Sequence, residues 1–321
     1  MGTSTYWDRK RVLVTGASGF IGRYLVGRLR ELSAQVYGSR SPAGRPPTSE
    51  VNDLESDVHR ARPSLVFDIR DAEAVQDAVN EARPDVVFHL AAVGATDPSV
   101  DATRALMVNA GGTVNLLQAV RKSDVDRVVL AGTSYEYGAH GATGRLDPFN
   151  AYSASKVAAW AFGHMYWRAY GLPVVIVRPF QVYGPGQPDK ALIPSAIRAA
   201  LSGKDFPMTG GEQVRDFIFA EDIADGMIAA AEAAGIAGKS LDLGTGIGTS
   251  VRSVVDRIWT LADAEGSMRP GALPYRSHAA MDLVADADKT TQLTGWCATT
   301  ALAEGLQVTM EELEFQMEQR R

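Results

Sequence analysis

Cysteine is almost absent from this sequence, since Cys297 is the only one among 321 residues. A single thiol excludes a disulfide within the chain and indicates a reducing compartment. The five histidines show no metal-ligand spacing, so no metal site is expected. No apolar run approaches the roughly 18 residues of a membrane-spanning helix, and the N-terminus shows no signal-peptide pattern. The sequence therefore predicts a cytoplasmic protein with no membrane partner.

Positive charge is also scarce, because 32 Lys and Arg stand against 38 Asp and Glu, a formal net charge of -6. A surface of this sign repels nucleic acid and anionic lipid, so neither is expected as a partner. Hydrophobic residues make up 45% of the chain. At this length that composition supports a large core, in one big domain or two lobes.

Apolar strands and helices alternate along the first half of the chain. The strands are almost continuously apolar, which is typical of a parallel sheet covered by helices on both faces. The predicted strands are Arg11–Thr15, Gln35–Tyr37, Leu65–Phe67, Val86–Leu90, Arg127–Leu130 and Val174–Val177. The fold class is therefore α/β, a doubly wound parallel sheet of the Rossmann type.

A glycine-rich loop, TGASGFIG, joins the first strand to the first helix. Its glycines permit a tight turn and a close approach of the backbone to a pyrophosphate. The N-terminus of the following helix offers free N–H groups to the phosphates. The loop therefore predicts a dinucleotide site formed by Gly16, Ser18, Gly19, Phe20, Ile21 and Gly22.

The end of the second strand bears on which dinucleotide binds. NAD-binding sheets usually carry an acidic residue there, which holds the ribose hydroxyls. This strand continues instead to Ser39 and Arg40, a hydroxyl and a planar cation that suit a 2′-phosphate. The sequence therefore favours NADP and leaves NAD open.

The pattern changes after Pro179, where turns are frequent and helices less regular. We expect a dinucleotide-binding Rossmann domain over residues 1–180 and a mainly substrate-binding lobe over residues 181–321. A strand near 240–246 is expected to return from the smaller C-terminal lobe to the large sheet.

Tyr152 and Lys156 are the candidate acid–base pair, because their i,i+4 spacing places them on one face of a predicted helix. A tyrosine with a pKa near 10 is a slow acid–base catalyst at neutral pH, and a neighbouring ammonium together with a nicotinamide cation is expected to lower that pKa. Thr133 follows a strand at the carboxyl edge of the sheet, where ligands bind in such folds. It is expected to hydrogen-bond a substrate carbonyl near Tyr152.

These motifs occur in an order that resembles the extended short-chain dehydrogenase/reductases of the nucleotide-sugar epimerase/dehydratase family. The resemblance rests on TGASGFIG, the HLAA segment at His89, Asn109, the Thr133 segment, Tyr152 and Lys156, RPFQVYGPG from Arg178, RDFIFAED from Arg215, and LDLGTG from Leu241. It covers nearly the whole chain and implies a nucleotide-diphosphate sugar as substrate.

The resemblance also implies roles for individual residues. Asp68 and Ile69 would flank the adenine, Ala91 and Ala92 the ribose, and Lys156 the nicotinamide ribose, with Leu90 and Asn109 also at the cofactor. Arg215 would lie against the substrate diphosphate. Gln181 stands where the family usually has an asparagine at the substrate. The helices near 109–120 and 160–167 would pair two subunits through a four-helix bundle, which predicts a homodimer.

The residues after Thr133 bear on the reaction. The family's dehydratases place an Asp–Glu pair there, whereas this chain has Ser134 and Tyr135, so dehydration is not expected and both are assigned to the substrate site. Glu136 comes one position later, and an alternating strand would turn it to the opposite face, in a structural role.

Three functions remain open. The absent acid near Arg40 and the TSYEYG run favour an NADPH-dependent reductase of a nucleotide-linked 4-keto-6-deoxyhexose, with Tyr152 as the acid. The alternative is a nucleotide-sugar 4-epimerase that recycles a retained NAD. A non-catalytic NADP sensor is the remote alternative, since such regulators typically lose the tyrosine or the lysine.

Overall fold

The computed structural model describes residues 6–42, 65–95, 97, 99–142, 144–275 and 280–319. Its first part is a seven-stranded sheet in the order β10-β6-β5-β4-β1-β2-β3, and every pair in it is parallel. The strands are β1 (Arg11–Thr15), β2 (Gln35–Arg40), β3 (Leu65–Val66), β4 (Val86–His89), β5 (Arg127–Ala131), β6 (Val174–Pro179) and β10 (Ser240–Leu243). The predicted α/β fold class with a doubly wound sheet is therefore confirmed.

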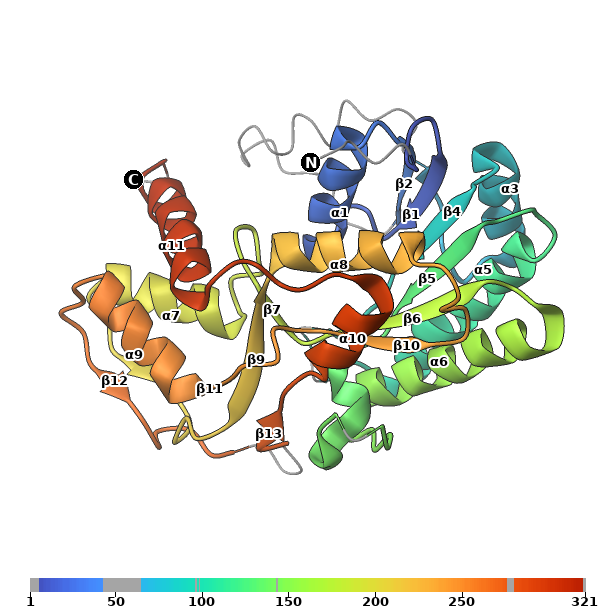
Figure 1. Cartoon of the computed structure of the whole chain (residues 1–321). Helices are drawn as coiled ribbons and strands as arrows, with labels where there is room; N and C mark the ends of the chain where they lie inside the picture. The colour runs from blue at the N-terminus through green and yellow to red at the C-terminus, as the bar shows by residue number, and fades with distance from the viewer. Residues whose placement is uncertain are drawn as a thin grey trace.

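Helices cover both faces of this sheet because each strand presents apolar side chains to each face. Val12 and Val14 of β1 pack under α1 and α8, while Leu13 between them packs under α3, α5 and α6 on the opposite face. Figure 1 shows α8 running along one face of the sheet beside α1. The helices are α1 (Phe20–Glu31), α3 (Ala72–Ala82), α4 (Ala102–Ala105), α5 (Gly112–Val120), α6 (Ala151–Tyr170) and α8 (Ala220–Glu232), with a π-helical turn, η1 (Leu106–Gly111), between α4 and α5.

A smaller mixed sheet carries the second lobe. Its central strand, β9, pairs with β7 and β13 in parallel and with β11 antiparallel. Three helices pack their apolar faces against β9, and Figure 1 shows them at the far end of the molecule from α3. The elements of this lobe are β7 (Gln181–Tyr183), α7 (Leu192–Leu201), β9 (Val214–Phe219), β11 (Gly248–Ser250), α9 (Val251–Leu261), β13 (Asp282–Leu283) and α11 (Leu302–Gln319), with a separate pair of short strands, β8 (Phe206–Pro207) and β12 (Met268–Arg269). The remaining helix, α10 (Ala287–Thr294), packs against β10 and α8 of the large unit.

The chain passes more than once between the two parts. β10, in the C-terminal half, pairs with β6 at the edge of the large sheet. α8 packs against α1, although it follows directly after β9 of the small sheet. The large α/β unit therefore includes residues well beyond position 180.

The second strand begins at Gln35 and continues to Arg40 as predicted, so Ser39 and Arg40 lie within β2. One local prediction differs from the structure. The segment after Thr133 is a 3-10 helix, η2 (Ser134–His140), and not an alternating strand.

Candidate active site

The glycine-rich loop lies at the carboxyl end of β1 and packs against backbone. Gly16 has a positive φ of 73°, and a Cβ added to it would lie 2.8 Å from the backbone nitrogen of Ala91. A Cβ on Gly22 would collide with the carbonyl oxygen of Gly16. Only glycine fits both positions, which brings the backbone of the loop close to the end of β4.

The N-terminus of α1 fits a diphosphate. Gly19 is the N-cap residue, and no side chain caps the helix in the described part of the chain. The first N–H groups of α1, from Phe20 and Ile21 onward, therefore have no side-chain acceptor, and they carry the positive end of the helix dipole. Ser18 is exposed beside them. The predicted phosphate residues thus form one cradle that matches a dinucleotide.

Ser39 and Arg40 lie at the adjoining end of β2. The carbonyl of Ser39 accepts a hydrogen bond from the backbone N–H of Ala17 in the glycine loop, at 3.1 Å. Arg40 is half-buried, and its guanidinium makes no ion pair within the described residues. A cation without a carboxylate partner beside the phosphate loop is available to an anionic ligand.

Asp68 and Ile69, predicted at the adenine, follow β3. Asp68 forms an ion pair with Arg70, whose hydrogen bond holds the pKa of that carboxyl below its usual value. Ile69 is buried against Gly112, and its carbonyl accepts a hydrogen bond from Asn115. These contacts fix the loop at the carboxyl edge of the sheet.

A buried hydrogen-bond chain supports Leu90, Ala91 and Ala92, which follow β4. Thr113 Oγ1 donates its only hydrogen to the carbonyl of Asn109, so His89 Nε2–H donates to Thr113 Oγ1, at 3.0 Å. His89 Nδ1 then accepts from the hydroxyl of Thr15, at 2.6 Å. Thr15 Oγ1 in turn accepts from the N–H of Ala91. His89 is therefore a neutral structural residue, and burial lowers its pKa to about 3.

Asn109 is used within the protein. Its amide donates to the carbonyl of Val93 at 3.0 Å and to the hydroxyl of Ser155 at 2.8 Å, and its oxygen accepts from the N–H of Val93. Both amide hydrogens are thus occupied within the protein, which gives Asn109 a positioning role, and its predicted place at the cofactor stays a prediction. Asn109 ties the loop after β4 to α6, one residue from Lys156.

Thr133, Tyr152 and Lys156 come together at the carboxyl end of β5. The hydroxyl of Thr133 lies close to the phenol of Tyr152 and acts to lower the pKa of that phenol. Lys156 Nζ lies 6.0 Å from the centre of the Tyr152 ring and donates to the carbonyl of Ala131, at 2.8 Å. All three catalytic candidates are buried. Two elements distant in the sequence, β5 and α6, form this cluster.

In the protein without a cofactor, burial is the main influence on the ionisation of Tyr152 and Lys156. Burial raises the pKa of Tyr152, opposed by the hydrogen bond from Thr133. Burial also lowers the pKa of Lys156 to about 8. Lys156 is not among the groups that shift the pKa of Tyr152 in the protein alone. The expected lowering of that pKa by the ammonium together with a nicotinamide cation concerns the cofactor-bound site and stays a prediction.

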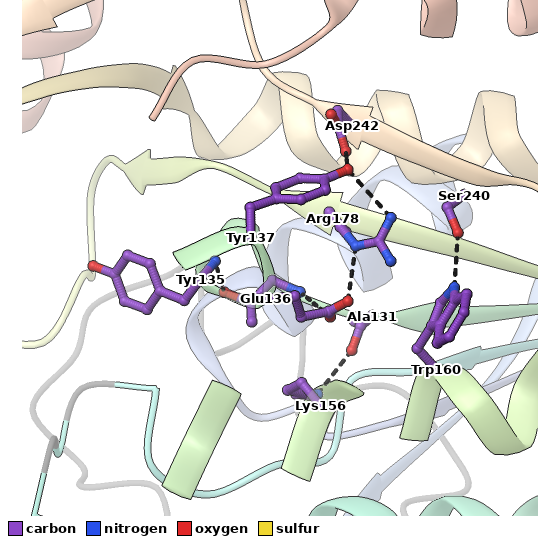
Figure 2. A network of polar contacts seen from close by, with 10 residues as sticks. Ala131, Tyr135, Glu136, Tyr137, Lys156, Trp160, Arg178, Ser240 and Asp242 are labelled. Atoms are coloured by element: carbon purple, nitrogen blue, oxygen red, sulfur yellow. Dashed lines mark hydrogen bonds and ion pairs between the residues drawn. The ribbon is translucent and has the colours of Figure 1, made fainter. Parts of the chain in front are cut away.

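The sequence T-x-x-E after β5 forms a capping box. The hydroxyl of Thr133 accepts from the N–H of Tyr135, and Glu136 Oε1 accepts from the N–H of Thr133. This signal was present in the sequence and predicts a helix start, not a strand. The turn buries Ser134 and Glu136, whereas the side chain of Tyr135 points away from the polar network in Figure 2.

Gln181 and Arg215 lie in the small sheet, in β7 and β9 respectively. The guanidinium of Arg215 donates to the carbonyls of Val214 and Ala280 and makes no ion pair in the part of the chain that the structure describes. Burial lowers its pKa, while Tyr135 and Asp282 favour the charged form. A half-buried cation without a carboxylate partner is suited to a phosphate.

Within the described residues no group of His, Cys, Asp and Glu side chains is arranged to hold a metal ion. The same residues include no helix that is long and apolar enough to span a bilayer.

Residues 12–244 match the model of the NAD dependent epimerase/dehydratase family. The chain is 32% identical to a UDP-glucose 4-epimerase of Mycolicibacterium smegmatis, over 94% of this chain and 97% of the relative.

Two solved structures are similar along nearly their whole length. A UDP-glucose 4-epimerase of Thermotoga maritima with UDP-glucose gives a TM-score of 0.85 at 25% identity, covering 95% of this chain and 99% of the other. A UDP-glucuronic acid 4-epimerase of Bacillus cereus, in complex with UDP-glucuronic acid and NAD, gives the same TM-score, identity and coverage.

Proposed function

Since the chain belongs to the NAD dependent epimerase/dehydratase family, we propose that it is a nucleotide-sugar 4-epimerase. The observation that carries the proposal is the buried cluster of Thr133, Tyr152 and Lys156 at the carboxyl edge of the large sheet. The two residues after Thr133 carry no carboxylate, so the cluster is suited to oxidation and reduction at one carbon and not to loss of water.

The residues would act on a single sugar carbon. The bound dinucleotide would supply hydride uptake and return at that carbon. Tyr152 would exchange a proton with the oxygen on the same carbon, and Thr133 would hold that oxygen by a hydrogen bond. Lys156 would hold the cofactor ribose and, as an ammonium, stabilise negative charge on the phenol oxygen.

The comparisons favour epimerisation over the reductase that the sequence favoured. The relatives described above are named as 4-epimerases, and one was solved with NAD. A UDP-sugar would suit Arg215 in β9, whose guanidinium makes no ion pair among the described residues and would meet a diphosphate with the N–H groups not used by Val214 and Ala280. We propose a nucleoside diphosphate hexose as the substrate class.

One observation favours a second candidate, an NADPH-dependent 4-ketosugar reductase. β2 ends in Ser39 and Arg40, and no acidic residue stands there to hold the ribose hydroxyls of NAD. The guanidinium of Arg40 would instead pair with a 2′-phosphate.

One experiment separates the two candidates. The purified protein is denatured and the released dinucleotide identified by mass spectrometry, and then UDP-glucose, UDP-glucuronic acid and dTDP-glucose are each incubated with the intact protein. Retained NAD and formation of the 4-epimer, with no net change in NADH, support the epimerase. In a parallel incubation the protein is given NADPH and a nucleotide-linked 4-keto-6-deoxyhexose. Consumption of NADPH only in this second incubation supports the reductase, and binding without turnover of either kind contradicts both.

The Arg40→Ala variant tests the choice of dinucleotide. If a 2′-phosphate meets Arg40, the variant weakens NADPH binding by about tenfold or more and leaves NADH binding unchanged, because one charge-assisted contact is lost. Equal effects on both cofactors contradict a role for Arg40 in the choice between them.

A further inference from the structure

Glu136 is fully buried beside the catalytic cluster, although it touches neither Tyr152 nor Lys156 through a hydrogen bond. Its Oε1 accepts from the backbone N–H of Thr133 at 2.9 Å, and its Oε2 accepts from Arg178 Nε at 2.8 Å. The 3-10 turn of η2 brings it back over Thr133, as Figure 2 shows for its link to Arg178. A carboxylate is rarely buried completely unless it is paired and hydrogen-bonded.

Glu136 and Lys156 bind the same short backbone segment, residues 131–133, from two sides. Lys156 donates to the carbonyl of Ala131 at 2.8 Å, and Glu136 accepts from Thr133 two residues later. The intervening Gly132 has no room for a side chain, because an added Cβ would collide with Glu136 Oε1. The backbone that presents the Thr133 hydroxyl to Tyr152 is therefore clamped between a carboxylate and an ammonium.

The charged groups around Lys156 also point to Glu136 as its electrostatic partner. Lys156 makes no ion pair among the described residues, and burial opposes its charge, while the field of Glu136 raises its pKa. The other ionisable groups near Lys156 are His89 from β4, which is neutral, and Tyr152 from its own helix. Glu136 also faces Arg178 from β6 and shares no hydrogen bond with Lys156.

The network continues beyond Arg178 to the edge strand of the sheet. Arg178 donates to the hydroxyl of Tyr137 at 3.3 Å, and Tyr137 donates to Asp242 of β10 at 2.7 Å. Figure 2 shows this chain running away from Lys156. Asp242 is thus a second buried acid of the same network, and it does not influence the pKa of Lys156.

We propose that Glu136 is a positioning residue of the active site. It holds the backbone of Thr133 in the turn that directs the threonine hydroxyl to Tyr152, and it sets its negative charge against the ammonium of Lys156. The part of the proposal that concerns turnover rests on the proposed function, whereas the part that concerns Lys156 does not.

The test follows the titration of Lys156 by NMR of protein labelled at the lysine Cε carbons, with Lys156→Met to assign the signal. Glu136→Gln removes the charge and is expected to lower the titration midpoint of Lys156 by about one pH unit. Asp242→Asn is the matched control, because it removes a buried acid from the same network, and its midpoint should equal that of the wild type. An unchanged midpoint in Glu136→Gln, or an equal shift in Asp242→Asn, overturns the proposal.

Glu136→Asp separates the geometry from the charge and serves also if Glu136→Gln fails to fold. The shorter acid keeps its charge near Lys156 but draws back from Thr133. We expect a midpoint close to that of the wild type together with a fall in kcat of about tenfold or more and little change in KM. If Glu136→Asp has the kcat of the wild type, Glu136 does not position Thr133. If the titration midpoint of Lys156 falls by a full pH unit in Glu136→Asp, the charge of Glu136 is not what supports the ammonium.

The pH profile of turnover gives the functional measurement. In Glu136→Gln both limbs of the profile should move to lower pH, because one negative charge near Tyr152 and Lys156 is lost. A merely structural role for Glu136 would lower the melting temperature and leave the profile in place. If the wild type turns over no nucleotide sugar, the proposed function fails, and the Lys156 titration still decides the role of Glu136.

Discussion

Tyr152 and Lys156, two buried ionisable side chains, lie at the centre of the site. Burial favours the neutral phenol of Tyr152 and the neutral amine of Lys156, so the protein alone does not produce a phenolate. A phenol that keeps its proton is a competent acid, and it becomes a base only when positive charge is brought near it. The pair is therefore arranged to change protonation state with the charge of what binds beside it.

Tyr152→Phe tests the central role directly. Loss of the phenol hydroxyl should lower kcat by about 10² to 10⁴, the usual contribution of a positioned acid–base group, and leave dinucleotide affinity nearly unchanged. Steady-state kinetics of 4-epimer formation and a cofactor titration measure the two effects. Turnover within about twofold of the wild type would remove Tyr152 from the mechanism.

His89 predicts how stability depends on pH. Its folded pKa of about 3 lies below the unfolded value near 6.5, so the unfolded chain binds more protons between these values. The free energy of unfolding that His89 contributes is therefore fully present above pH 6.5 and is lost as the pH falls toward 3. Between pH 6.5 and 5 this loss is about 2 kcal/mol.

Urea denaturation of the wild type and His89→Gln at several pH values checks this slope. Gln offers a donor and an acceptor to Thr113 and Thr15 but does not titrate. The wild type should lose about 2 kcal/mol more than the variant between pH 6.5 and 5. If both proteins lose the same free energy of unfolding between pH 6.5 and 5, His89 does not control the fall in stability at acid pH.

At the scale of the element, α6 positions Tyr152 and Lys156. Asn150 caps its N-terminus by accepting from the N–H of Ser153, and Ser153 Oγ accepts in return from the N–H of Asn150. Tyr152 and Lys156 lie on the first turns after this cap, one helical turn apart. The position of the helix start therefore decides where the phenol lies relative to Thr133 on β5.

Asn150→Ala should cost about 1 kcal/mol of stability, because the N–H of Ser153 loses its acceptor. It should also lower kcat more than it changes dinucleotide affinity, since the first turn of α6 carries Tyr152. Thermal melts and kinetics measure both, with Asn150→Asp as the control that keeps the cap. Equal stability and kcat in Asn150→Ala and the wild type would contradict this role.

At the scale of the whole molecule, large apolar side chains stand exposed on η1 and α6, which pack against each other. Leu106 and Met107 are 54% and 51% exposed, and Phe162 and Met165 are 41% and 36% exposed. Exposed apolar groups gathered on adjoining elements commonly mark an interface. We predict that a second copy of this chain covers them in a homodimer, as the sequence indicated for these helices.

Light scattering after gel filtration at micromolar concentration tests the assembly. The wild type should elute as a dimer, and Phe162→Glu should produce a folded monomer, because a charge in an apolar interface is costly to bury. Val308→Glu on α11, an exposed apolar residue far along the chain, is the control and should leave the dimer intact. A monomeric wild type would end this prediction.

Local patterns in the sequence predicted the fold and the elements on which the candidate site residues lie. The apolar strands, the glycine spacing from Gly16 to Gly22 and the Tyr152–Lys156 pair each depend on residues close in sequence, and the sheet, the loop and the helix appear where these patterns lie. Thr133 and Glu136 also carried a local signal, the capping box, which outweighs the alternation of a short strand once both side chains bond the backbone.

Tertiary structure decided what the local patterns left open. It buried Glu136 against Arg178, used both amide hydrogens of Asn109 inside the protein and let desolvation set the ionisation of Tyr152. These outcomes depend on which side chains from distant segments meet and on how much water they exclude. Sequence spacing specifies neither, because burial and pairing are properties of the packed chain.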